Sequence, residues 1–248
     1  SDAPTVVTAF YRVSFTVVAL VPFVARGDDV SIERATVRDG VVAVAAGVAL
    51  ACHFLAWFES LDRTTVAASV TLVQTQPVFV VCGAWLLLDE RIGRRTLLGV
   101  GVALVGAVIL SVGGDFLTLG ALTAPPVTGS TAGNLLAVLG AVAAAAYVLA
   151  GRSLRRRLPV LPYVAVVYSV CAAVLLAVAI GQDQPLLSYP RHEWVLFAAM
   201  ALGPGVAGHT VVNWALGHLE SHVVSVSLLG EPVGSTLLAV VFLSEVPT

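Results

Sequence analysis

Eight long apolar stretches separated by short polar connectors constrain the fold of this chain more than any other feature. A helix needs about 20 mostly apolar residues to cross a bilayer, whereas barrel strands are about 10 residues of alternating polarity. Of the 248 residues, 58% are apolar and 11% are charged, against about 25% charged in soluble domains. We therefore predict an all-α, polytopic membrane helix bundle. The predicted spans are residues 4–25, 40–58, 64–88, 96–113, 132–151, 160–181, 194–216 and 222–243.

The distribution of arginine predicts which connectors face the cytoplasm, because cytoplasmic loops carry an excess of basic residues. Three alternate connectors together hold ten of the 13 basic residues, and the other connectors hold only Arg63 and Arg191. The arginine-rich connectors are residues 26–39, 89–95 and 152–157. We expect these three inside and the connectors between them outside. The chain is thus predicted to be a multi-pass protein of the cytoplasmic membrane.

Two of the spans carry nearly the same pattern, in which a proline opens an apolar run and a glutamate closes it. The pattern occurs at residues 77–90 and again at residues 232–245, an offset of 155 residues. An offset of 156 residues relates His53 to His209. The matching spans are five apart in order, an odd number, so the two copies cross the membrane in opposite directions. This pattern indicates inverted-topology duplication, an architecture used for alternating access in transporters.

Counting spans from the duplication predicts the domain organisation. Residues 1–113 form a first five-helix repeat without its first helix, and residues 132–248 form a second repeat without its last helix. Residues 114–131 carry no basic residue and form the extracellular connector between the repeats. The chain does not begin with Met. We expect it to hold about eight of the ten transmembrane helices of a longer protein.

Several short motifs occur in a characteristic order along the chain. They are A-P-x(6)-Y-R at 3–12, L-L-L-D-E-R at 86–91, W-A-L-x-x-L at 214–219 and L-L-G-E-P-V-G-S-T-L-L-A-V-V-F-L-S-E-V-P-T at 228–248. Together they resemble the drug/metabolite transporter (DMT) superfamily, and within it the EamA-type permeases. The resemblance covers essentially the whole chain. It implies a secondary transporter that moves a small metabolite or drug-like solute by alternating access, and it names no cargo.

Polar residues beside the two repeated prolines are the first candidates for the solute or ion pathway. Glu231 precedes Pro232 near the middle of a span, where an ionised carboxylate is costly and faces a cavity or a partner. It is a candidate for proton coupling, or alternatively a hydrogen-bonded group that stabilises a kinked helix. Gln76 occupies the equivalent position before Pro77, and Gln74 flanks the same kink. Each glutamine either lines the pathway or bonds a neighbouring helix.

Three basic side chains within the spans are further candidates. Arg12 lies about eight residues into the first span, where it either snorkels to the interface or holds a carboxylate or phosphate of the solute. His53 and His209 lie in matching helices. They are candidates for proton transfer or anion binding, and interhelical hydrogen bonds explain them equally well.

Aromatic and amide side chains complete the set of candidates. Trp57, Trp214, Tyr168 and Asn213 are predicted to line the cavity, although an interfacial belt also explains the aromatic residues. The Gly-Pro-Gly sequence around Pro204 interrupts the seventh span. Such a break marks either close helix packing or a discontinuous helix near a binding site.

Other classes of function lack the residues they require. The sequence contains no GxSxG, HExxH or paired-Asp motif of an intramembrane enzyme, so we expect no catalytic residues and no enzyme activity. The three cysteines have no metal-ligand spacing, and we expect no metal or other cofactor. The net charge of −2 gives no electrostatic basis for binding nucleic acid.

The expected partners are therefore the lipid bilayer and a small-molecule solute, coupled to a proton or exchanged for another solute. The oligomeric state, including a homodimer, stays open. A non-transporting membrane sensor or scaffold is the alternative that duplication leaves standing.

Overall fold

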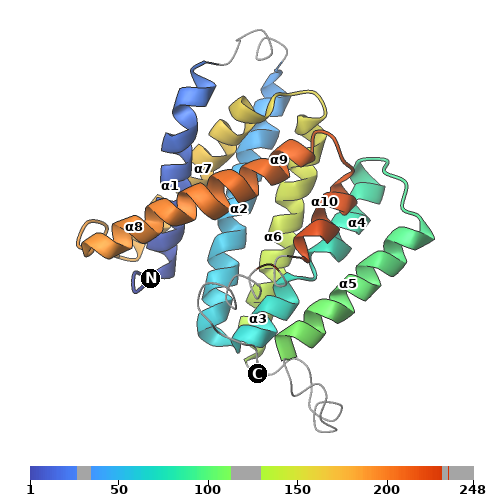
Figure 1. Cartoon of the computed structure of the whole chain (residues 1–248), viewed down its shortest axis with the longest axis horizontal. Helices are drawn as coiled ribbons and strands as arrows, with labels where there is room; N and C mark the ends of the chain where they lie inside the picture. The colour runs from blue at the N-terminus through green and yellow to red at the C-terminus, as the bar shows by residue number, and fades with distance from the viewer. Residues whose placement is uncertain (27–34, 113–129, 231–233, 235–248) are drawn as a thin grey trace.

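The computed structural model describes residues 1–26, 35–112, 130–230 and 234, and the described residues form helices and connecting loops (Figure 1). Six helical stretches in this part of the chain are long and apolar enough to cross a membrane. They are α1 (Thr5–Val24), α2 (Val37–Arg63), the α3–α4 stretch (Val66–Leu87), α6 (Thr131–Arg155), α7 (Val160–Gly181) and the α8–α9 stretch (Arg191–Ala215). The prediction of an all-α membrane helix bundle is confirmed.

The two remaining predicted spans also contain helices. The fourth corresponds to α5 (Arg94–Val112) at the edge of the bundle, and the described part of the eighth is α10 (Ser221–Leu228). The closing segment of the second proline motif, with Glu231, Pro232 and Glu245, lies outside the described residues.

Several helices extend beyond their predicted ends because polar residues cap them. Helix α2 begins at Val37 rather than at residue 40, since Thr36 and Asp39 form a capping box. In this box the Asp39 amide donates to the Thr36 hydroxyl, and the Thr36 amide donates to the Asp39 carboxylate at 2.9 Å. Helix α6 begins after Ser130, whose hydroxyl accepts from the Gly133 amide at 3.0 Å. It continues to Arg155, four residues past the predicted end.

Two of the proline-containing spans are discontinuous. The third predicted span divides into α3 (Val66–Val73) and α4 (Gln76–Leu87), with Pro77 in the first turn of α4. Proline has no amide proton and favours the start of a helix, so the break falls just before it. The seventh span divides into α8 (Arg191–Met200), a π-helical stretch η3 (Ala201–Thr210) that contains Pro204, and α9 (Val211–Ala215).

Helix α2 runs through the middle of the bundle and packs on both α6 and α7, while α1 packs on α7 and crosses η3 (Figure 1). The α2–α6 contact is built from small residues, which let two helix backbones approach closely. On α6 the buried small residues include Ala137, Gly140, Ala141, Ala144 and Ala145. Large apolar side chains such as Val18, Phe23, Trp85 and Leu98 are exposed around the bundle, as expected for a surface that faces lipid.

Matching helices of the two repeats run in opposite directions, as Figure 1 shows for α1 and α7. Two equivalent helix crossings each require a glycine. A Cβ on Gly47 of α2 would stand 2.6 Å from the Val167 carbonyl oxygen of α7. A Cβ on Gly205 of η3 would overlap the Thr16 hydroxyl of α1. Each repeat thus uses a glycine to cross a helix of the other repeat closely: α2 crosses α7 at Gly47, and η3 crosses α1 at Gly205.

Candidate functional site

Five of the residues that the sequence singled out lie together inside the bundle, and we call them the central polar cluster. They come from α1, α2, α7, η3 and α9 and are Arg12, His53, Tyr168, His209 and Asn213. Tyr168 and Asn213 are fully buried, and the other three are partly buried. The cluster draws residues from both repeats, which the sequence alone did not predict.

Arg12 lies against the aromatic ring of Phe54, with its guanidinium carbon 5.1 Å from the ring centroid. This cation–π contact stabilises a cation inside the bundle. The His209 ring also packs edge-on against the Phe54 ring, with the two centroids 5.8 Å apart. A cavity of about 10 Å³ lies among Arg12, Thr16, Phe54, Tyr168 and His209. This volume suits about one water molecule and no solute.

Asn213 connects three of the helices through its side-chain amide. The amide nitrogen donates to the Tyr147 hydroxyl of α6, to the Tyr168 hydroxyl of α7 at 3.2 Å and to the His209 carbonyl at 2.8 Å. Within the part of the chain that the structure describes, the buried amide oxygen of Asn213 has no hydrogen-bond partner, and neither has the nearby hydroxyl of Tyr163. Unpaired buried polar atoms are costly and are typical of sites that receive water or a ligand.

His53 bonds a neighbouring helix, the alternative noted for it from the sequence. Its Nδ1 atom lies 2.9 Å from the Gly140 carbonyl oxygen of α6. A carbonyl only accepts, so Nδ1 carries the proton and Nε2 is left as an acceptor. The ring stacks on Trp57 with centroids 5.7 Å apart, and no described residue accepts a hydrogen bond from the buried Trp57 ring nitrogen.

The other predicted residues lie apart from the central polar cluster or outside the described residues. Gln74, Gln76 and Pro77 stand at the break between α3 and α4. Trp214 is 52% exposed and packs against the His218 ring at a tilt, so it faces away from the bundle interior. The structural description does not extend to Glu231 or Pro232.

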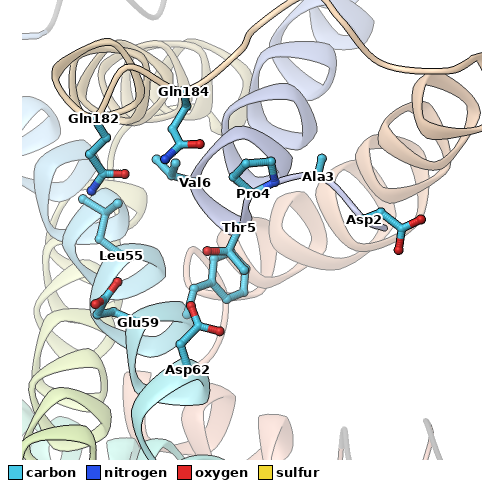
Figure 2. Close-up of a pocket in the computed structure, with 11 residues that line it drawn as sticks. Asp2, Ala3, Pro4, Thr5, Val6, Leu55, Glu59, Asp62, Gln182 and Gln184 are labelled. Atoms are coloured by element: carbon cyan, nitrogen blue, oxygen red, sulfur yellow. The ribbon is translucent and has the colours of Figure 1, made fainter.

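A larger hollow of about 420 Å³ opens at one end of the bundle between α1, α2 and α7 (Figure 2). Its rim carries the carboxylates of Asp2, Glu59 and Asp62 and the amides of Gln182 and Gln184. Phe58 also lines the hollow and stacks on Phe54 with centroids 5.9 Å apart. One aromatic pair therefore separates the hollow from Arg12.

Near this end, the ligand atoms of Asp2, His192 and Glu193 lie within 4.8 Å of one another. The buried Glu193 carboxylate already accepts from the Ser1 hydroxyl at 2.6 Å and from the Asp2 amide at 2.8 Å. These bonds fasten the N-terminal segment to α8. The group is explained by this role without a metal ion.

Charged contacts gather at the opposite end, which we call the arginine-rich end and define by Asp39, Glu90, Arg152, Arg155 and Arg157. Arg157 pairs with Asp39 on α2. Arg152 pairs with Glu90, a residue that is only 6% exposed. Arg155 is buried and donates to the Asn213 carbonyl at 2.9 Å and to the Leu158 carbonyl. Arginines that the sequence analysis counted only as topology signals thus have specific partners.

Burial disfavours ionisation of Glu90, but the hydrogen bonds from the Ser221 amide and hydroxyl and from Arg152 outweigh it. The pKa of the Glu90 carboxyl is therefore held below its ordinary value. Sequence reasoning treated Glu90 as the marker of a helix end. The repeated glutamate was the available signal, and its partners lie far away in sequence.

Comparison with known proteins identifies the family. The EamA-like transporter family matches residues 1–112 and residues 131–248. The chain belongs to the EamA-like transporter family.

The two matched segments of this EamA-like protein supply both halves of the central polar cluster, with Arg12 and His53 in the first and Tyr168, His209 and Asn213 in the second. The chain is similar in fold to a solved structure described only as "Crystal structure of protein". The TM-score is 0.79 at 22% sequence identity, over 100% of this chain and 82% of the other. No curated protein matches the chain.

Proposed function

We propose that this EamA-like protein is a secondary transporter that moves a small metabolite or drug-like solute across the cytoplasmic membrane. The two inverted repeats rock about the central polar cluster and expose it alternately to each side. The protein acts without a cofactor and without catalysis. A solute is its partner, coupled to a proton or exchanged for a second solute.

The central polar cluster is the observation that carries this proposal. Polar side chains are expensive inside a membrane and face a pathway or one another. Here a guanidinium, two imidazoles, a phenol and an amide from both repeats meet between the helices, and the amide oxygen of Asn213 lacks a hydrogen-bond partner among the described residues. The hollow of about 420 Å³ is lined by Phe58, which stacks on Phe54, and Phe54 in turn contacts Arg12 of the cluster. A membrane scaffold needs neither feature.

The size of the cluster's own cavity supports a moving pathway rather than a fixed pore. With room for about one water molecule, the centre does not hold a solute in this arrangement. We infer that the Phe54–Phe58 pair and Arg12 separate when a solute enters from the hollow. Binding then requires a conformational change, as alternating access does.

The test is flux of solutes into liposomes that contain the whole protein. Solutes are first chosen by their ability to raise its melting temperature, because a ligand stabilises the state that binds it. We expect at least one such solute to exchange across the membrane, and Asn213→Leu to abolish both its thermal shift and its exchange. Stabilising solutes that never cross would favour the sensor or scaffold alternative.

A further inference from the structure

We propose that Glu90, Arg152 and Ser221 form the gate that closes the solute pathway at the arginine-rich end. This inference rests on the proposed transport function. It assigns to these residues a role in positioning the two repeats, and it makes their separation the step that opens this end of the pathway.

The backbone fixes Glu90 at the end of α4. Asp89 has a φ of 53°, in the left-handed region that is uncommon for residues other than glycine. This turn brings the amides of Leu88 and Glu90 back to the Ala84 carbonyl, at 3.1 and 3.2 Å. The Glu90 side chain is thereby directed off the helix end and into the interior.

Glu90 caps a helix of the other repeat. Helix α10 has no side-chain cap of its own at its N-terminus. The Ser221 amide lies 3.1 Å from both carboxylate oxygens of Glu90, and the Ser221 hydroxyl donates to one of them at 2.8 Å. A carboxylate at a helix N-terminus satisfies free amides and interacts well with the helix dipole. The first repeat thus supplies the cap that the second repeat lacks.

Arg152 extends this contact to a third and a fourth helix. From α6 its Nε donates to Glu90 at 2.9 Å, and its Nη1 donates to the Leu216 carbonyl at the end of α9 at 3.0 Å. His222 stands 3.4 Å from the same carboxylate, and Glu220 lies on the far side of that imidazole. The ends of α4, α6, α9 and α10 are therefore joined around one carboxylate.

The contact has the properties of a gate. It crosses between the segments matched as repeats, so relative motion of the repeats strains it. A buried ion pair gains little net energy over its separated, hydrated partners. Glu90 and Arg152 can therefore separate into water at the membrane surface and re-form at modest cost. The hollow at the other end is open while this contact is closed.

Ser221→Pro tests the gate with little disturbance of the helix. Proline fits the first position of a helix, and Glu220 already has the extended backbone (ψ 146°) that a residue before proline prefers. The substitution removes the two donors that Ser221 supplies to Glu90, its amide and its hydroxyl, and leaves the Arg152 contact in place. Ser221→Ala removes the hydroxyl alone and retains the amide, and Glu90→Gln removes the charge alone.

The readout is thiol labelling of Ser225→Cys by a membrane-impermeant methanethiosulfonate, applied to the predicted cytoplasmic side of vesicles. Ser225 is fully buried one turn after Ser221, and the cysteine removes no hydrogen bond seen among the described residues, because the Ser225 hydroxyl has no partner there. The three native cysteines are replaced by alanine in every variant. The matched control is Arg63→Gln, which breaks an exposed ion pair with Glu59 at the opposite end.

We expect Ser221→Pro and Glu90→Gln to speed labelling about tenfold or more, because hydrogen bonds to a charged group are the strong ones. Ser221→Ala should give an intermediate rate and Arg63→Gln the unmodified rate. Unmodified labelling in Glu90→Gln and Ser221→Ala, both shown to be folded by thermal melting, would overturn the gate. Faster labelling with no solute flux would preserve the gate and refute transport instead.

Discussion

The crossing of η3 over α1 gives the sharpest stability prediction, because one glycine and one hydroxyl determine how closely the two helices approach. A Cβ on Gly205 overlaps the Thr16 hydroxyl, which itself donates to the Arg12 carbonyl at 2.7 Å and also lies 3.2 Å from the Ala201 carbonyl. We expect Gly205→Ala to lower the free energy of unfolding by about 1–2 kcal/mol, since overpacking costs about 1–3 kcal/mol and alanine recovers up to about 1 kcal/mol of helix propensity.

Truncating the partner should relieve part of this cost. Thr16→Ala alone loses about 1 kcal/mol with its hydrogen bond. In the double variant the new Cβ faces only the Thr16 Cβ, at 3.2 Å, which a small helix shift accommodates. The two losses should therefore combine to about 1 kcal/mol less than their sum, as expected for residues in contact.

The assay is denaturant unfolding of the whole protein in detergent for the four members of the cycle. Gly203→Ala is the matched control on the same π-helical stretch, because a Cβ there meets no atom within 4 Å. We expect that control to be neutral or slightly stabilising. Losses that add within about 0.5 kcal/mol would show that Gly205 and Thr16 do not act on one another.

Three further predictions concern charged side chains. Glu231→Gln should abolish the pH dependence of transport, and an unchanged pH dependence would remove Glu231 from proton coupling. Because the folded pKa of Glu90 is depressed, its contribution to stability is present above the ordinary glutamate pKa and is lost as pH falls through the lower folded pKa. Glu90→Gln should therefore flatten the curve of melting temperature against pH over that acidic range. A variant curve that runs parallel to that of the unmodified protein would contradict this. Asp39→Ala should cost about 1–2 kcal/mol of unfolding free energy by removing half of the α2 capping box. Arg157→Gln, which alters the exposed partner in the Asp39–Arg157 ion pair, should cost under about 1 kcal/mol. Equal losses in the two variants would place the effect in the ion pair rather than in the cap.

The spans could be predicted from the sequence because apolar length alone identifies a membrane helix. The break before Pro77 and the irregular helix around Pro204 were also predictable, since proline removes a backbone donor wherever it stands. Helix ends were less certain. Asp39 and Arg155 lie within helices rather than in connectors because a capping box and buried carbonyl partners extend those helices.

The grouping of the candidate residues required the structure. Arg12, His53, His209 and Asn213 were each recognisable as unusual in a span, but hydropathy gives neither the rotation of a helix nor its neighbour. The partners of Glu90 required the structure for the same reason. The Glu90 carboxylate accepts a hydrogen bond from Ser221, which lies 131 residues later in the sequence, and the left-handed turn at Asp89 directs it there.

Counterflow in liposomes tests the central claim most directly. Liposomes holding the whole protein and an excess of an unlabelled stabilising solute are diluted into a trace of the labelled solute. If two repeats alternate around the central polar cluster, label accumulates transiently inside, and Asn213→Leu removes the accumulation while the protein stays folded. Accumulation that persists in folded Asn213→Leu protein, or that never appears with any stabilising solute, would contradict a pathway through this cluster.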